Sequence, residues 1–229
     1  EIDLAVHSFK DLPTDNPLPL KVAAVPRRHD PRDTLVAPLG TGFLNNPDTE
    51  AVIATGSNRR KAQWLHKYPN HTVTDIRGNV NTRLQKVRDN KWHGAVFAAA
   101  GLQRIGLEKH IGLYLDWMVP APAQGALAVV VREDASELAK ICKPLNHEET
   151  AICTEIERDL LHELEAGCSA PVGAYAEILN EKVHLYAVVL SIDGTLQYDI
   201  ELESDVESFA GLGKRAGREL LGKGAKDLI

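Results

Sequence analysis

The chain of 229 residues carries a formal net charge of −6, and 44% of its residues are hydrophobic. This composition supports a buried core and excludes a wholly disordered chain. The charge is uneven, since residues 1–109 balance to +5 and residues 110–229 to −11, so we expect an anion-handling region joined to an acidic one. Aromatic residues make up only 5% of the chain, so we expect no nucleic-acid partner.

Membrane association is not expected, because no apolar stretch approaches the ~18 residues that span a bilayer. The three cysteines are an odd number with no CxxC pair, which is typical of reduced thiols in a cytoplasmic protein. The histidines show no metal-ligand spacing, so no metal is expected. The chain starts without Met, directly before a predicted buried strand over residues 2–6, so we expect that an N-terminal segment is missing.

Four short apolar runs in the first half are each followed by a segment that carries a cation. The predicted strands cover residues 2–6, 51–54, 72–76 and 94–100. Their alternation with amphipathic stretches predicts βα units and a largely parallel sheet. Ligands bind at the carboxyl ends of such strands. The cations expected there are Lys10, Arg59, Arg60, Arg77, Arg83 and Arg104.

These cations favour a pocket for a ligand with several carboxylates or phosphates, because the arginine fork binds such groups bidentately. Arg59 and Arg60 are predicted to lie in the first turn of a helix that continues to Tyr68. Cations there oppose the helix dipole at a cost of ~0.3–1 kcal/mol each, which a bound anion would offset. The alternative is a solvated helix surface with no ligand.

Asp11 is the one carboxylate among these junction cations. Neighbouring cations favour its ionised form, so it is a candidate acid or base, or a group that stabilises a positive intermediate. The alternative is a helix-start aspartate paired with Lys10.

Two segments bounded or interrupted by prolines predict crossings between domains, at residues 26–33 and 119–125. They indicate a discontinuous first domain, made of residues 1–30 and 119–145, and a continuous second domain over residues 31–118.

From residue 146 onward the pattern changes, and apolar residues recur every four positions from Ile152 to Leu164, which predicts a helix. The elements expected after it are strands over residues 172–179, 183–192 and 196–202, with a hairpin turn at Asp193-Gly194 between the last two, and a terminal helix over residues 206–221. The predicted class is α/β, with two α/β domains followed by a small α+β domain over residues 146–229.

Cys168 follows the end of the predicted helix, in Glu165-Ala166-Gly167-Cys168. That end of the dipole does not stabilise a thiolate, so Cys168 is a poor turnover nucleophile. A single covalent attachment needs no strongly activated thiol. The alternative, a small buried thiol, also holds for Cys142 and Cys153.

Taken together, these segments resemble the porphobilinogen deaminase (hydroxymethylbilane synthase) family. The matching segments are Asp3–Pro13, Asp30–Asp33, Thr55–Arg60, Arg77–Leu84, Ala99–Arg104, Ala123–Ala126 and Leu164–Cys168. They run in family order along nearly the whole chain and are specific as a set. The departures from the usual pattern are Gly56, Asn58, Ala123 and Ala166.

The resemblance implies two domains similar to periplasmic binding proteins and a small third domain. It implies that Cys168 carries a dipyrromethane cofactor through a thioether. Four porphobilinogen units would be deaminated and joined head to tail into hydroxymethylbilane, and we expect the enzyme to be a cytoplasmic monomer. The family also has a further N-terminal segment, whose absence puts the activity of this chain in question.

The resemblance also implies residue roles. Asp11 would be the catalytic carboxylate. The residues implied to bind the cofactor, besides Cys168, are Lys10, Ser57, Arg59, Arg60 and Arg83. Those implied to bind the substrate are Ser8, Arg77 and Arg104. The alternatives are a non-catalytic, hinged anion-binding protein of the periplasmic-binding type, and an inert fragment.

Overall fold

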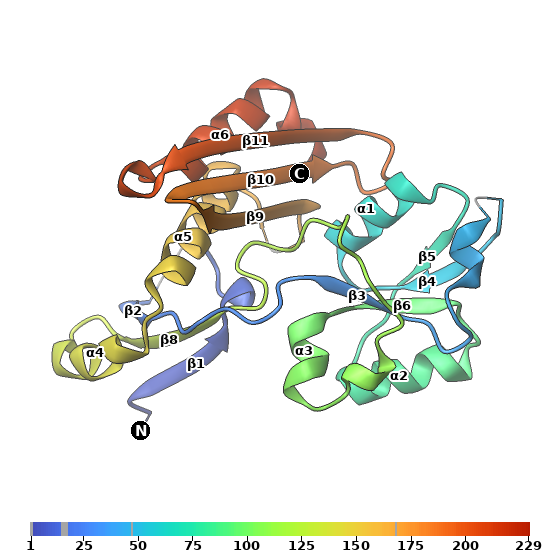
Figure 1. Ribbon diagram of the computed structural model, residues 1–229, viewed down its shortest axis with the longest axis horizontal. Coiled ribbons are helices and arrows are strands. Elements are labelled where there is room, and N and C mark those ends of the chain that lie inside the picture. Colours follow the sequence, from blue (N-terminus) through green and yellow to red (C-terminus); the bar gives the residue numbers. More distant parts are fainter. Residues whose placement is uncertain (1, 15–17, 47, 168) are drawn as a thin grey trace.

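The computed structural model describes residues 2–14, 18–46, 48–167 and 169–229. Within these residues the chain forms three β-sheets, each with its own helices. In Figure 1 the third sheet lies above the other two, which sit side by side below it. We call each sheet with its helices a unit. The predicted α/β class is confirmed, whereas the predicted domain boundaries stay predictions.

The first unit holds an antiparallel sheet in the order β1-β8-β2. Its elements are β1 (Leu4–Ser8), η1 (Phe9–Asp11), β2 (Leu20–Ala24), β8 (Leu127–Arg132), α4 (Ser136–Cys142) and η4 (Lys143–Leu145). The prediction that the first strand is buried is wrong, because Val6 is 55% exposed. β1 is an edge strand of this small sheet, and within the described residues nothing covers the side chains of Leu4 and Val6 on one of its faces.

The second unit holds a mixed sheet in the order β5-β4-β6-β3-β7. Its elements are β3 (Asp33–Val36), η2 (Gly42–Asn45), β4 (Val52–Ala54), α1 (Asn58–Lys67), β5 (Thr72–Thr74), α2 (Val80–Asp89), β6 (Gly94–Ala98), α3 (Ala99–Arg104), η3 (Glu108–His110) and β7 (Leu113–Tyr114). β4 is parallel to β5 and β6, but β3 is antiparallel to β6 and β7. The predicted largely parallel sheet is therefore wrong for the first unit and only partly right here.

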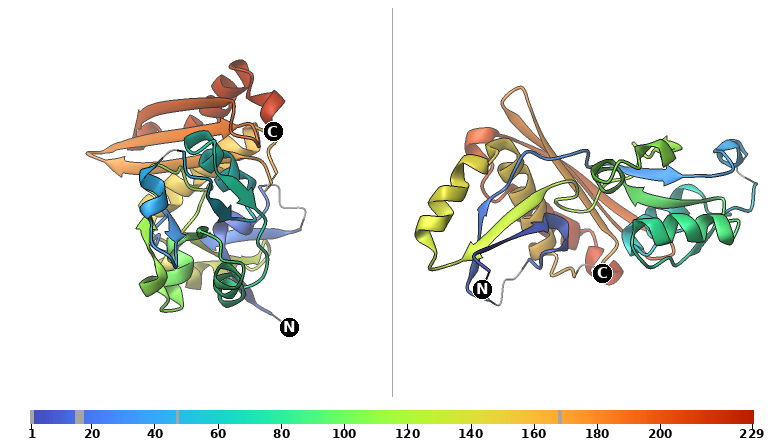
Figure 2. Two further views of the ribbon diagram at one scale, coloured as in Figure 1. Left: turned by 90° about the vertical axis from the view of Figure 1, so that its right-hand side faces the viewer. Right: turned by 90° about the horizontal axis from the view of Figure 1, so that it is seen from below.

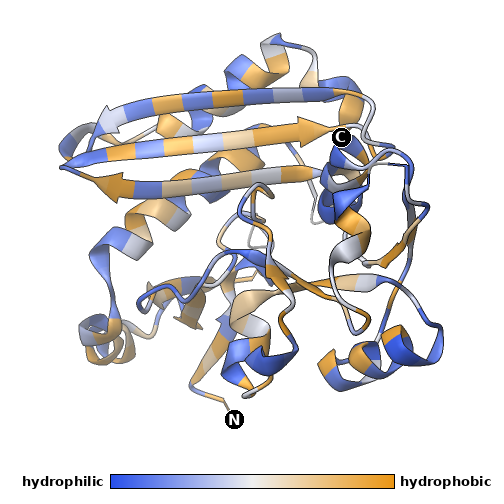
Figure 3. Cartoon of the chain, turned by 45° about the vertical axis from the view of Figure 1, so that its right-hand side comes forward, coloured by the Kyte–Doolittle hydropathy of each residue, from blue (hydrophilic) through white to orange (hydrophobic). Residues whose placement is uncertain are grey.

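The third unit is an antiparallel sheet in the order β11-β10-β9, packed against two helices. Its elements are α5 (Glu148–Glu163), β9 (Val172–Leu179), β10 (Lys182–Leu190), β11 (Gln197–Asp205), η5 (Val206–Ser208), α6 (Leu212–Gly222) and η6 (Ala225–Leu228). Figure 3 shows hydrophobic and hydrophilic residues alternating along β11, as expected for a sheet with one covered face.

The long helix α5 follows the predicted stripe, with Ile156, Leu160 and Leu164 buried in the core of the third unit. The terminal helix differs from its prediction, since α6 begins only at Leu212. The preceding Gly211 has a φ of +79°, a left-handed conformation that separates α6 from the short helix η5. No helix in the described residues has the length and apolarity needed to cross a membrane.

Two segments run between the first and second units, as the views in Figure 2 also show. We call the segment near residues 26–33 the first crossing and the segment near residues 119–125 the return crossing. A hydrogen bond joins the two crossings, in which His29 N–H donates to the carbonyl of Gly125 over 3.0 Å. Gly125 has a φ of +86°, and a Cβ there would lie 2.8 Å from the His29 carbonyl oxygen. A side chain at this position would therefore push the crossings apart.

Candidate functional site

A cavity of about 800 Å³ lies where all three units meet. Its lining comes from η1, from the β4–α1 and β5–α2 junctions, from the return crossing and from the loop after α5. The predicted site residues that line it are Lys10, Asp11, Ser57, Arg59, Arg60, Arg77 and Arg83. The structure thus brings most of the predicted site into one cavity, although these residues come from distant parts of the sequence.

Two predicted residues lie elsewhere. Ser8 ends β1 and Arg104 ends α3, where it is exposed, and neither lines the cavity. Cys168 lies outside the described residues. Its neighbour Ser169 does line the cavity, and the Ser169 carbonyl accepts a hydrogen bond from Asn58 Nδ2 at the start of α1 over 2.9 Å.

The floor of the cavity is built around Asp33, whose side chain is completely buried. Arg59 Nη1 lies 2.7 Å from Asp33 Oδ2, and Arg60 Nη2 lies 2.8 Å from Oδ1. Burial by itself would raise the pKa of Asp33, but the two guanidiniums lower it to about 2. The carboxylate therefore stays ionised and fixes both arginines, which are themselves buried.

Gln124 extends this network from the return crossing. Its Nε2 donates to Asp33 Oδ1 over 2.9 Å and to the Pro31 carbonyl over 2.7 Å. Its Oε1 accepts from Lys10 Nζ and from Arg59 Nη2, each over 3.3 Å. One amide side chain thus connects the cations of η1 and α1, which belong to different units.

Lys10 has an unusual electrostatic environment. Burial, with the nearby positive charges of Arg60 and Arg59, lowers its pKa from 10.5 to about 8. Its ammonium donates to Gln124, and among the described residues no ion pair joins it to Asp11. The alternative of a simple Lys10–Asp11 pair is therefore not observed.

Asp11 is exposed and lines the cavity at the end of η1. In the described part of the chain its carboxylate has no hydrogen-bond partner. Its position therefore depends on the backbone of the turn. A free carboxylate beside several cations can exchange a proton with a bound molecule or stabilise positive charge on it.

Arg77, which is exposed, and Arg83, which is half-buried, are less enclosed than the buried arginines of the floor. Arg77 Nε pairs with Asp75 Oδ2 over 3.0 Å, and Arg83 Nε donates to the Gly78 carbonyl over 2.7 Å. These contacts leave both guanidiniums partly in solvent, where their remaining N–H groups can bind further carboxylates.

The site fits a polycarboxylate group. Three cations of the floor, Lys10, Arg59 and Arg60, face a single buried carboxylate, so positive charge remains uncompensated there. Arg59 Nε is also buried without a hydrogen-bond partner among the described residues, which costs about 1–3 kcal/mol unless a ligand accepts from it. A bound carboxylate would offset both costs.

Asp33 and Gln124 are the functional residues that sequence reasoning missed. Both stand in segments that carry the family resemblance, but neither was given a role. The signal that could have identified Asp33 is the Arg59-Arg60 pair, since cations buried in an α/β core need a carboxylate partner. Nothing local identified Gln124, because its role depends on three segments meeting.

Family models match two parts of the chain. Residues 1–140 match "Porphobilinogen deaminase, dipyromethane cofactor binding domain", and residues 151–222 match "Porphobilinogen deaminase, C-terminal domain".

Curated relatives match along the whole chain. It is 42% identical to the porphobilinogen deaminase of Thermus thermophilus, of which it spans 77%, and 39% identical to a probable porphobilinogen deaminase of Methanococcoides burtonii, of which it spans 74%.

The structural likeness is weaker. A TRAP periplasmic solute-binding protein from Desulfovibrio salexigens with bound orotic acid gives a TM-score of 0.36 at 9% identity, over 56% of this chain and 40% of that protein. This score is too low to support an argument about the fold.

Proposed function

Because the chain belongs to the porphobilinogen deaminase family, we propose that the cation-lined cavity is its catalytic cleft. Proteins of this family are transferases that join four porphobilinogen units into a linear tetrapyrrole. The single observation that carries the proposal is that Ser169, next to Cys168 in sequence, lines the same cavity as Asp11 and the cations of α1. The family match does not favour the alternative of a non-catalytic anion-binding protein.

Cys168 would hold the dipyrromethane cofactor, which would supply the free pyrrole carbon to which substrate is joined. Each pyrrole ring carries an acetate and a propionate, so a two-ring group brings four carboxylates into the cavity. Lys10, Ser57, Arg59, Arg60 and Arg83 would hold these carboxylates. The buried cations suit this role, because Asp33 and Gln124 fix their geometry before any ligand arrives.

Asp11 acts on the substrate in this proposal. Porphobilinogen loses its aminomethyl nitrogen as ammonia, and positive charge develops on its pyrrole ring. The Asp11 carboxylate stabilises that charge, and it accepts the ring proton that is lost when the new carbon–carbon bond has formed. The exposed Arg77 binds the carboxylates of the incoming substrate. Ser8 and Arg104 stay predicted substrate ligands from the family resemblance, although neither lines this cavity.

We also propose that the enzyme acts as a monomer without a nucleic-acid partner, because the residues assigned to the cleft complete it without a second molecule. Cys142 and Cys153 are both free and buried, which supports a reducing, cytoplasmic location.

Intact mass tests the attachment site. The purified chain should carry an added mass equal to one dipyrromethane, and Cys168→Ser should lack it. Cys153→Ser is the matched control, since Cys153 is a buried free thiol and should leave the adduct in place. An adduct that survives in Cys168→Ser would overturn the assignment.

A further inference from the structure

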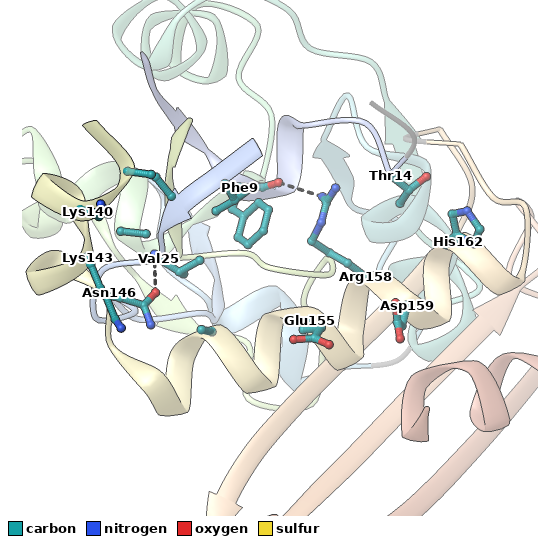
Figure 4. A pocket seen from close by; sticks show the side chains of 15 residues that line it. Phe9, Thr14, Val25, Lys140, Lys143, Asn146, Glu155, Arg158, Asp159 and His162 are labelled. Atoms are coloured by element: carbon teal, nitrogen blue, oxygen red, sulfur yellow. Dashed lines mark hydrogen bonds between the residues drawn. The ribbon is translucent and has the colours of Figure 1, made fainter. Parts of the chain in front are cut away.

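Arg158, on α5 of the third unit, contacts the turn η1 that carries Lys10 and Asp11. Its Nη1 donates to the carbonyls of Phe9 (3.2 Å) and Leu12 (3.0 Å), and its Nη2 donates to the Pro13 carbonyl (2.6 Å). The guanidinium also lies 4.6 Å from the centre of the Phe9 ring. Figure 4 shows Arg158 reaching from α5 to the Phe9 carbonyl.

These contacts bracket Asp11 on both sides. Phe9 precedes it in η1, and Leu12 and Pro13 follow it. The turn is a single 3-10 turn closed by a hydrogen bond of 3.3 Å from Leu12 N–H to the Phe9 carbonyl. The buried Phe9 also anchors its start, where Phe9 N–H donates to the Ala126 carbonyl over 3.0 Å, whereas the carbonyls of Leu12 and Pro13 after Asp11 are held by Arg158. Because the Asp11 carboxylate itself is exposed, the direction in which it points follows the backbone that Arg158 holds.

Arg158 does not line the cation-lined cavity. It lines two other cavities, of about 650 and 330 Å³. Figure 4 shows it among the residues that line the larger of these two. Any effect on the reaction must therefore pass through the turn rather than through contact with substrate.

The helix that carries Arg158 also fixes the other half of the cleft. Its next-door residue Glu157 is buried and accepts hydrogen bonds from the backbone N–H groups of Ala123 and Ala176. α5 ends at Glu163, and the loop after it leads to Ser169 at the cavity. One rigid helix therefore relates the Asp11 turn to the segment that contains Cys168.

We propose that Arg158 is a positioning residue for the condensation reaction, which acts by holding the η1 turn so that Asp11 faces the reacting pyrrole. The proposal rests on the proposed function, in which Asp11 is the catalytic carboxylate. The fork geometry matters, because three carbonyls must be reached at once, and a lysine ammonium on a flexible stem cannot reproduce that arrangement.

The experiment uses Arg158→Lys in the cofactor-loaded enzyme, well below its unfolding temperature. We expect kcat to fall about 10- to 100-fold, because a displacement of about 1 Å at a reacting group has an effect of that order. KM for porphobilinogen should stay within about twofold of its value in the unsubstituted enzyme. The added mass of the cofactor should be unchanged. Arg132→Lys is the matched control, since the forked contact of Arg132 is with the exposed Asp134 and not with the η1 backbone, and it should leave kcat unchanged.

A double-mutant comparison separates this proposal from the proposed function. Asp11→Asn alone should lower kcat by about 10²- to 10⁴-fold. Adding Arg158→Lys to Asp11→Asn should cause little further loss if Arg158 acts through Asp11. If the loss of kcat in the double variant equals the product of the two single losses, or if kcat is normal in Arg158→Lys, the positioning role is overturned. Normal turnover in Asp11→Asn would overturn the proposed function itself.

Discussion

A single buried carboxylate decides what the two arginines of α1 do. The sequence predicts that Arg59 and Arg60, at the start of a helix, bind an anion. In the structure their partner is Asp33, so part of their charge is already balanced. The positive charge that Asp33 does not balance affects Lys10. Its pKa is lowered by burial and by the nearby charges of Arg60 and Arg59. The ligand-responsive cation of the floor is therefore the lysine.

The first prediction concerns pH. With a pKa of about 8 in the free protein, Lys10 loses its positive charge as the pH rises from about 7 to 9. Carboxylate binding weakens in that range, so loading of the cofactor-free protein with the dipyrromethane group, whose carboxylates Lys10 is proposed to hold, should fall with a midpoint near pH 8. Lys10→Arg stays charged and should lose this decline. An unchanged decline in Lys10→Arg would show that another group titrates there.

At the scale of elements, α1 is attached to the third unit at both ends. Asn58 in its first turn bonds to the Ser169 carbonyl, and His66 Nδ1 in its last turn lies 2.8 Å from the Gly194 carbonyl oxygen. The predicted hairpin turn at Gly194 thus has a second role beyond joining two strands. It holds the helix whose first turn carries the buried arginines of the cavity.

The second prediction tests this docking. Gly194 has a φ of +75°, and a Cβ there would lie 2.5 Å from the backbone nitrogen of His66. Gly211 has a similar φ of +79° but open space around it, so Gly211→Ala measures the backbone strain alone, about 1–2 kcal/mol. Gly194→Ala should lower the free energy of unfolding by about 1–3 kcal/mol more than Gly211→Ala, from the overpacking. Urea unfolding compares them, and equal losses would contradict a close docking of turn and helix.

Across the whole molecule, the two crossing segments meet the third unit at Glu157. Its buried carboxylate pairs with Arg28 of the first crossing at 2.6 Å and accepts from Ala123 N–H of the return crossing and Ala176 N–H of β9. Burial by itself would lower the pKa of the Arg28 guanidinium, but the Glu157 carboxylate raises it above its usual value. One charged group therefore holds both crossings against the third unit.

The third prediction follows from that position. Glu157→Gln leaves Arg28 buried without its counter-charge, so the free energy of unfolding should fall by about 3–5 kcal/mol. Glu137→Gln is the matched control, because the Glu137–Lys140 pair is exposed and should change stability by at most about 0.5 kcal/mol. Thermal and urea unfolding of both variants give the comparison. A loss at Glu157 as small as at Glu137 would show that the junction is held by other contacts.

The sequence by itself determined the local elements, the cations after the strands and the family. Helix periodicity, capping residues and turn glycines act over a few residues, so α1, α5 and the turn at Gly194 could be predicted. The exposure of β1 could not, because burial depends on what packs against a strand. The burial of Arg59 and Arg60 depends likewise on a partner elsewhere in the chain.

Only the tertiary structure decided which distant side chains meet. Asp33 and Arg59 are 26 residues apart, Lys10 and Gln124 are 114 apart, and Arg158 and Phe9 are 149 apart. Pairings of this kind leave no spacing pattern, since they arise when whole units pack and buried polar groups must find partners. The kind of ligand was therefore readable from the chain, whereas the means by which the cleft is held in shape was not.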